Sequence, residues 1–177
     1  MEFWDEIYDE IRRDLEPANM LQGSQDFLGA WNVLQRHRQA PAVVAGQERF
    51  PIQATASCAS MALELALKCR VRLEGTTPPK THRFSALIAA MSPAAQDALA
   101  AAVRIDDRQV DAGGLLQALV ECDKTFETWR YLHEHDNADF FEPRLIDTTR
   151  ALHAIILKAN PNWQPAGVVP THLVHEP

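Results

Sequence analysis

The sequence predicts an all-α fold, an up-and-down bundle of four to five helices with extra N-terminal helices and an irregular C-terminal tail. Two observations lead to this prediction. Apolar residues recur at three- and four-residue spacing over several long segments, and no segment shows the alternating pattern of a half-buried strand. A chain of 177 residues is long enough for one domain with one sizeable core.

Two helices are expected before residue 40. The first covers residues 1–16 and is ended by Pro17, and the second begins after Ser24 as its N-cap and continues to about Arg38. Residues 39–51 contain two prolines and a glycine and are expected to form a loop. Residues 1–50 are therefore an N-terminal helical extension, joined to a bundle of residues 52–158 within a single domain of residues 1–177.

The longest predicted helix runs from about Ile52 to Glu74. Small residues in its first half would let another helix approach closely, and Gly75 follows it as the expected C′ residue. Residues 76–81, "TTPPKT", then form a turn. The apolar stripe of this helix consists of Ala59, Leu63, Ala66, Leu67 and Val71.

Two short helices are expected next. The first covers residues 82–91, and the second begins with Ser92 as N-cap and Pro93 at its first position, and ends near Arg104. A loop follows over residues 105–114.

Two longer helices complete the bundle. One extends from Gly114 to about Asp136, and the last extends from Pro143 to Asn160. Prolines interrupt residues 161–177, so the tail is expected to be irregular. The residues expected on the buried sides of these two helices are Leu115, Leu119, Cys122, Phe126, Trp129, Leu145, Leu152, Ile155 and Ile156.

The charge is unevenly distributed along the chain. The net charge of −7 argues against a general nucleic-acid coat protein, and residues 1–16 hold seven acids against two arginines. Residues 68–83 instead hold five basic side chains against Glu74 alone. These side chains, together with a histidine, are predicted to line a phosphate-binding surface, although a solvated basic face is the alternative: Lys68, Arg70, Arg72, Lys80, His82 and Arg83.

The cysteines and the N-terminus indicate a cytoplasmic protein. The three cysteines are odd in number and have no CxxC spacing, so we expect buried reduced thiols and neither a disulfide framework nor a zinc site. No basic start precedes an apolar stretch, and no apolar run is long enough to cross a bilayer.

Three segments, in this order and spacing, resemble the HEPN domain family: "ASMALELALKCRVRLEG" (59–75), "TPPKTHRFSALIAAMSP" (77–93) and "FETWRYLHEH" (126–135). The resemblance covers about residues 52–158. It implies a four- to five-helix bundle, often a homodimer, and frequently an association with nucleotides or RNA. Some HEPN proteins are metal-independent ribonucleases in toxin or antiviral defence systems, with a signature of Arg, four to six residues, then His. Arg130 and His135 match that signature.

Metal-independent cleavage of RNA needs a base for the 2′-hydroxyl proton and a cation for the negative phosphorane. Histidine suits the first role and arginine the second, so Arg130 is the predicted phosphate ligand and His135 or His133 the acid–base group. On a continuous helix Arg130 and His135 lie about 140° apart. They converge only where the helix ends or bends, or where a partner chain supplies one of them. His133 shares the face of Arg130, and Asp123 lies on the same stripe and is expected to orient that arginine.

Other interpretations of the same segment remain open. Arg130 and Glu134 have the spacing of an exposed ion pair. Tyr131 is typical of HEPN proteins with no demonstrated cleavage, which favours a non-catalytic module that binds a nucleotide or a partner protein, such as a nucleotidyltransferase antitoxin. A scaffold that dimerises through Phe3 and Trp4 is a third interpretation. No metal or other cofactor is predicted, because His133 and His135 diverge on a helix.

Overall fold

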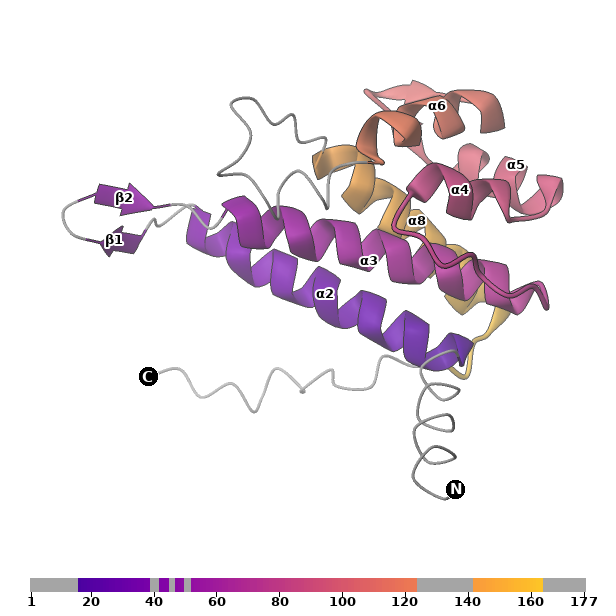
Figure 1. Ribbon diagram of the computed structural model, residues 1–177, viewed down its shortest axis with the longest axis horizontal. Coiled ribbons are helices and arrows are strands. Elements are labelled where there is room, and N and C mark those ends of the chain that lie inside the picture. Colours follow the sequence, from indigo (N-terminus) through magenta and orange to yellow (C-terminus); the bar gives the residue numbers. More distant parts are fainter. Residues whose placement is uncertain (1–15, 39–41, 45–46, 50–51, 124–141, 164–177) are drawn as a thin grey trace, which may run out of the picture.

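The computed structural model describes residues 16–38, 42–44, 47–49, 52–123 and 142–163 of the chain (Figure 1). Its helices dominate, and the strands form only two short antiparallel pairs, so the predicted all-α class is confirmed. In chain order the elements are α2 (Pro17–Arg38), β1 (Ala42–Val44), β2 (Gln47–Arg49), α3 (Ile52–Leu73), α4 (Phe84–Ala89), α5 (Pro93–Ala102), β3 (Arg104–Ile105), β4 (Arg108–Gln109), α6 (Ala112–Cys122) and α8 (Glu142–Ala159).

Helix α3 is the centre of the bundle and packs against α2, α8 and α4 (Figure 1). Helix α2 runs antiparallel to it, because the Cys69 thiol donates to the Pro17 carbonyl at one end while Ser24 meets Ala62 further along. Helix α8 is also antiparallel to α2, since the Trp31 indole donates to Glu142 at the first residue of α8. Helices α3 and α8 therefore run in the same direction.

Small side chains set the close approach of these helices. Four alanines of α3 are fully buried, and a Cβ placed on Gly23 of α2 would lie 3.1 Å from the Leu65 side chain. The core also includes Met20 and Leu21, so the segment taken as an N-terminal extension contributes α2 to this core. The four buried alanines are Ala56, Ala59, Ala62 and Ala66.

The connection from α3 to α5 forms as predicted. Gly75 follows α3 with a φ of 77°, a left-handed conformation that glycine adopts without steric cost. The Ser92 side chain caps α5 by accepting from the Ala95 amide, and Pro93 follows at the first helical position. Glu74, at the end of α3, accepts hydrogen bonds from both the amide and the hydroxyl of Ser92. The start of α5 is thus attached to the end of α3.

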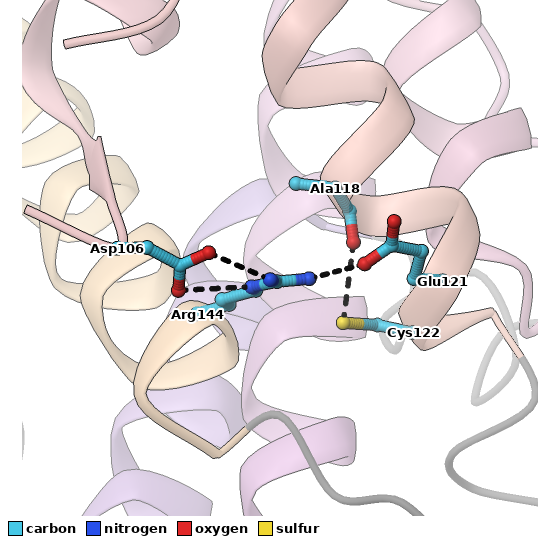
Figure 2. A network of polar contacts seen from close by, with 5 residues as sticks. All are labelled: Asp106, Ala118, Glu121, Cys122 and Arg144. Atoms are coloured by element: carbon cyan, nitrogen blue, oxygen red, sulfur yellow. Dashed lines mark hydrogen bonds and ion pairs between the residues drawn. The ribbon is translucent and has the colours of Figure 1, made fainter. Parts of the chain in front are cut away.

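An arginine joins α8 to the other layer of helices (Figure 2). Arg144 donates to both carboxylate oxygens of Asp106, in the turn between β3 and β4, and to Glu121 near the end of α6. Its side chain is only 15% exposed, so these two carboxylates balance a largely buried charge. Beside it, the Cys122 thiol donates to the Ala118 carbonyl of the same helix.

Two of the three cysteines are buried free thiols, as predicted, and Cys58 is half-buried. Burial raises the pKa of Cys69 and of Cys122 to about 12. Both thiols are therefore protonated at neutral pH, which suits their role as small core side chains.

The predicted start of the second helix was wrong. That helix, α2, begins at Pro17, because proline lacks only an amide hydrogen that the first helical turn leaves unpaired. Ser24 is not an N-cap but lies inside α2 with its side chain fully buried. The predicted helix of residues 1–16, with Phe3 and Trp4, lies almost wholly outside the described residues.

Two predicted loops contain short hairpins instead. Strand β1 pairs with β2 in the register Ala42 to Arg49, within the segment 39–51. Strand β3 pairs with β4, and the turn between them places Asp106 and Asp107 at positive φ, the backbone of a tight two-residue hairpin turn. Strands of two or three residues are too short to show the alternating pattern from which a strand is predicted.

The limits of α8 are within one residue of those predicted, whereas α5 and α6 both end earlier than predicted. Helix α5 ends at Ala102 and not near Arg104, because the backbone becomes extended at Val103 before β3. Helix α6 begins at Ala112, capped by Asp111, and ends at Cys122 with Asp123 as its C-cap. The rest of the predicted helix 114–136, and the tail from residue 164 onward, lie outside the described residues.

A buried polar pair connects the three long helices. The Ser24 hydroxyl donates to the Ala62 carbonyl at 2.6 Å and lies 2.7 Å from Nε2 of His153 on α8. A hydroxyl has one hydrogen, which Ser24 gives to Ala62, so His153 must donate from Nε2. His153 is 8% exposed, and burial lowers its pKa to about 4. The imidazole is therefore neutral in the folded protein at neutral pH.

We expect this histidine to make stability depend on pH. The unfolded chain binds its proton near pH 6.5 and the folded chain only near pH 4, so the free energy of unfolding should fall as the pH drops through that window. The loss should reach about 3 kcal/mol. Urea unfolding of the full chain at several pH values measures it. The variant His153→Gln keeps an N–H donor without the titration, so an equal pH dependence in both proteins would contradict this assignment.

Candidate functional site

The three predicted catalytic residues, Arg130, His133 and His135, lie outside the described residues. The structure does describe the residues just before this segment: α6 ends at Cys122, and Asp123 is its C-cap. The Asp123 carboxylate accepts a hydrogen bond from the Ser85 amide at 2.9 Å and a second, short one from the Ser85 hydroxyl. Ser85 lies in the first turn of α4, two residues after Arg83. The end of α6 is therefore fixed beside the basic turn.

We define the basic turn as residues 80–83, between α3 and α4. The Thr81 hydroxyl accepts from the Arg83 amide, and the Thr81 amide donates to the Pro79 carbonyl, so local hydrogen bonds shape this turn. Lys80, His82 and Arg83 are all exposed. Their place between two helices brings three of the six predicted phosphate-binding residues together on one short segment.

A carboxylate that the sequence analysis did not single out organises the other end of the predicted surface. Glu64 on α3 is 3% exposed, and its two oxygens have separate partners. Oε1 lies 2.6 Å from the Lys68 ammonium, and Oε2 lies 2.8 Å from Nδ1 of His82. A buried carboxylate with a cation and a ring N–H satisfies the rule that buried charges are paired. The structure thus brings Lys68 and His82 together through Glu64.

Two further predicted residues lie in the last turn of α3. Arg70 forms an ion pair with Glu74, 2.9 Å from Oε1, while Arg72 is half-buried. A guanidinium already paired to a carboxylate has less positive charge to offer a phosphate. Within the part of the chain that the structure describes, the predicted surface therefore divides into the paired cations Lys68 and Arg70, the half-buried Arg72 and the exposed side chains of the basic turn.

The sequence contains a feature that could have identified Glu64 as a buried, paired carboxylate. It stands between Leu63 and Ala66 on the apolar side of α3, where an unpaired carboxylate would be costly, and Lys68 follows it at i+4. A charged residue at a predicted core position indicates a partner from another element. The partner His82 is 18 residues away and could not be chosen from the sequence alone.

Two surface pockets lie elsewhere on the described part of the molecule. One of about 400 Å³ lies between the end of α5 and α8 and has Arg104, Asp147 and Arg150 in its wall. The other, of about 300 Å³, lies between the start of α2 and the end of α8 beside Trp163. Among the described residues, no three His, Cys, Asp or Glu side chains are grouped so that they could hold a metal ion, and no helix is long and apolar enough to span a membrane.

The comparisons with known proteins give no relative for this chain. No protein-family model matches it, and neither a curated protein nor a solved structure does so.

We expect the contact between Asp123 and Ser85 to stabilise the fold. Asp123→Ala removes a carboxylate that accepts from both the amide and the hydroxyl of Ser85, and leaves a half-buried amide without its partner. The free energy of unfolding should fall by about 1–3 kcal/mol, as measured by urea denaturation. Asp97→Ala, at an exposed aspartate of α5, is the matched control and should change stability by less than about 0.5 kcal/mol. Equal effects of the two substitutions would contradict this role.

Proposed function

We propose that this chain is a HEPN-type protein that acts on RNA as a metal-independent endoribonuclease. In this proposal it is a cytoplasmic homodimer, working in a toxin or antiviral defence system. Arg130 stabilises the negative charge that develops on the phosphate, and His135 or His133 takes the proton of the 2′-hydroxyl. The basic turn holds the neighbouring backbone phosphates.

One contact supports the proposal more than any other. The carboxylate of Asp123 bonds to Ser85 in the first turn of α4, so the residue that precedes the segment with the Arg130 and His135 spacing is attached to the helix that directly follows the basic turn. RNA cleavage requires cations for the backbone and an acid–base group in one place. We infer from this attachment that the two motifs belong to one RNA surface.

The alternative is a non-catalytic HEPN module that binds a nucleotide or a partner protein, such as a nucleotidyltransferase antitoxin. The observation that favours it is the pairing of the predicted basic residues. Lys68 and His82 both contact Glu64, and Arg70 contacts Glu74, so much of the expected positive charge is balanced within the chain. The identity of the residue after Arg130, Tyr131, also favours the non-catalytic alternative.

The cleavage proposal predicts that the purified full-length chain cuts single-stranded RNA in the presence of EDTA. Arg130→Ala and His135→Ala should each lower kcat/KM by about 10²–10⁴-fold, because each removes a group that acts in the transition state. His133→Ala tests the alternative base in the same assay. Arg108→Ala, at an exposed arginine of β4, is the control and should leave the rate unchanged. Failure of the wild type to cut any of several RNAs would refute cleavage, and binding without turnover would support the alternative.

The basic turn predicts a salt-dependent affinity for RNA. Lys80→Ala combined with Arg83→Ala should weaken binding and reduce the slope of log Kd against log salt by about 0.7 for each lost phosphate contact. Fluorescence anisotropy with a labelled single-stranded RNA measures both effects. The charge-matched control is Arg108→Ala combined with Lys158→Ala, two exposed cations on β4 and α8. If both double variants lose affinity equally, the attraction comes from net charge and not from the basic turn.

A further inference from the structure

The pocket of about 400 Å³ between the end of α5 and α8 receives an arginine from each of two elements. Arg104 comes from β3 and Arg150 from α8, and Asp147 of α8 adds a carboxylate to the same wall. A volume of this size is in the range of small-molecule sites. The apolar part of the wall consists of short side chains: Ala102, Val103 and Ala151.

Arg104 is held in place by the backbone and not by a carboxylate. Its Nε and Nη2 donate to the Asp107 carbonyl at 3.3 and 3.0 Å, across the turn between β3 and β4. A carbonyl accepts these hydrogen bonds without carrying a net charge, and no carboxylate of the described residues forms an ion pair with this arginine. The side chain is therefore positioned while its positive charge stays available to a ligand.

Arg150 is positioned mainly by an aromatic ring. Its guanidinium carbon lies 5.7 Å from the centre of the Trp31 ring of α2, which is within the range of a cation–π contact. Its Nη1 lies 3.7 Å from Oδ1 of Asp147, a separation too long for a hydrogen bond. The side chains of Arg150 and Asp147 are 54% and 53% exposed, so water screens this ion pair strongly. The donors of Arg150 are thus left for an anion in the pocket.

An earlier arginine of the same helix shows how a structural arginine of this protein is satisfied. Arg144 donates to the carboxylates of Asp106 and Glu121, and its side chain is only 15% exposed (Figure 2). Its charge is balanced within the fold. Arg104 and Arg150 instead have neutral or weak partners, and both line one pocket. Two positioned guanidinium groups with little neutralisation are what a bound anion would explain.

The three polar side chains of the pocket indicate the class of ligand. The planar fork of an arginine matches two oxygens of a phosphate, and a phosphate monoester carries about two negative charges at neutral pH. An ionised carboxylate only accepts hydrogen bonds, so Asp147 disfavours a second phosphate and suits a hydroxyl group.

We propose that this pocket binds a sugar phosphate, a small molecule with a phosphate monoester beside hydroxyl groups. Arg104 and Arg150 hold the phosphate, and Asp147 accepts a hydrogen bond from a hydroxyl. The site is separate from the basic turn, and its occupation does not depend on whether the chain cleaves RNA.

Isothermal titration calorimetry of the full chain with ribose 5-phosphate tests the proposal. Inorganic phosphate should bind at least about tenfold more weakly, since it lacks the hydroxyls that Asp147 accepts from. Arg104→Gln and Arg150→Gln should each raise the Kd for ribose 5-phosphate by about 10–100-fold, because each removes charge-assisted hydrogen bonds. Arg150→Lys keeps the charge without the planar fork and should also weaken binding. Asp147→Ala should abolish the preference for ribose 5-phosphate over inorganic phosphate.

The matched control is Arg108→Gln, at an exposed arginine of β4 that does not line the pocket. It should bind ribose 5-phosphate as the wild type does, and circular dichroism of each variant verifies the fold. A wild type that does not bind ribose 5-phosphate overturns the proposal. Equal affinity for inorganic phosphate overturns the class of ligand, and an equal loss in Arg108→Gln and Arg150→Gln overturns the site, because net charge would then explain the binding.

A second arm of the titration identifies the source of the ligand. The same chemical group occurs in a free sugar phosphate and at the 5′ end of an RNA chain. Two 2′-O-methylated trinucleotides, one with a 5′-phosphate and one with a 5′-hydroxyl, have no 2′-hydroxyl and so resist the proposed cleavage. Tighter binding of the phosphorylated one, lost in Arg150→Gln, supports the pocket as a site for RNA ends. Equal binding of the two, beside binding of ribose 5-phosphate, supports a free sugar phosphate.

Discussion

The central constraint on this molecule is that α3 must be covered on several sides at once. Its alanines from Ala56 to Ala66 are fully buried, which lets α2 and α8 approach closely, and the helix also packs against α4. Most positions of a helix that is covered on several sides are buried, so few of them can hold a polar group. Two of the polar groups that it does hold, the Ala62 carbonyl and the Glu64 carboxylate, receive hydrogen bonds from other elements. The arrangement of the surrounding helices follows from satisfying these groups.

Two carboxylates, one within α3 and one directly after it, hold the segment that follows the helix. Glu74 binds Ser92 at the start of α5, and Glu64, nearly three turns earlier, binds His82 before α4. The connection from Gly75 to Ser92 is therefore attached to α3 at two points and not only at its covalent end. Each carboxylate also pairs with a cation of α3 itself, so Lys68 and Arg70 are neutralised before any ligand is present. The exposed cations of the basic turn are the ones that this balance leaves for an outside partner.

The parts of the fold that local chemistry decides could be predicted from the sequence. The limits of α3, the glycine after it and the Ser92 cap depend on neighbours within a few residues, and they were predicted correctly. Ser24 was misassigned because a serine before an apolar run has the pattern of an N-cap, while its true partners are 38 and 129 residues away. Glu64 was left out of the predicted site for the same reason, because its partner His82 lies 18 residues away in the sequence. The six basic residues were selected by charge alone, and the sequence could not say which of them a carboxylate would neutralise.

The antiparallel contact of α2 with α8 has a consequence for how the chain folds. Trp31 must meet Glu142 across 111 residues, whereas α2 and α3 are joined by only a short hairpin. Contacts of such high sequence separation are slow to form, because a long loop has to close before they contribute. The pair of α2 and α3 can assemble early during synthesis, but its exposed apolar side stays uncovered until α8 has left the ribosome. The Ser24 hydroxyl and its imidazole partner are therefore among the last groups to meet, and they close the core only when nearly the whole chain has been made.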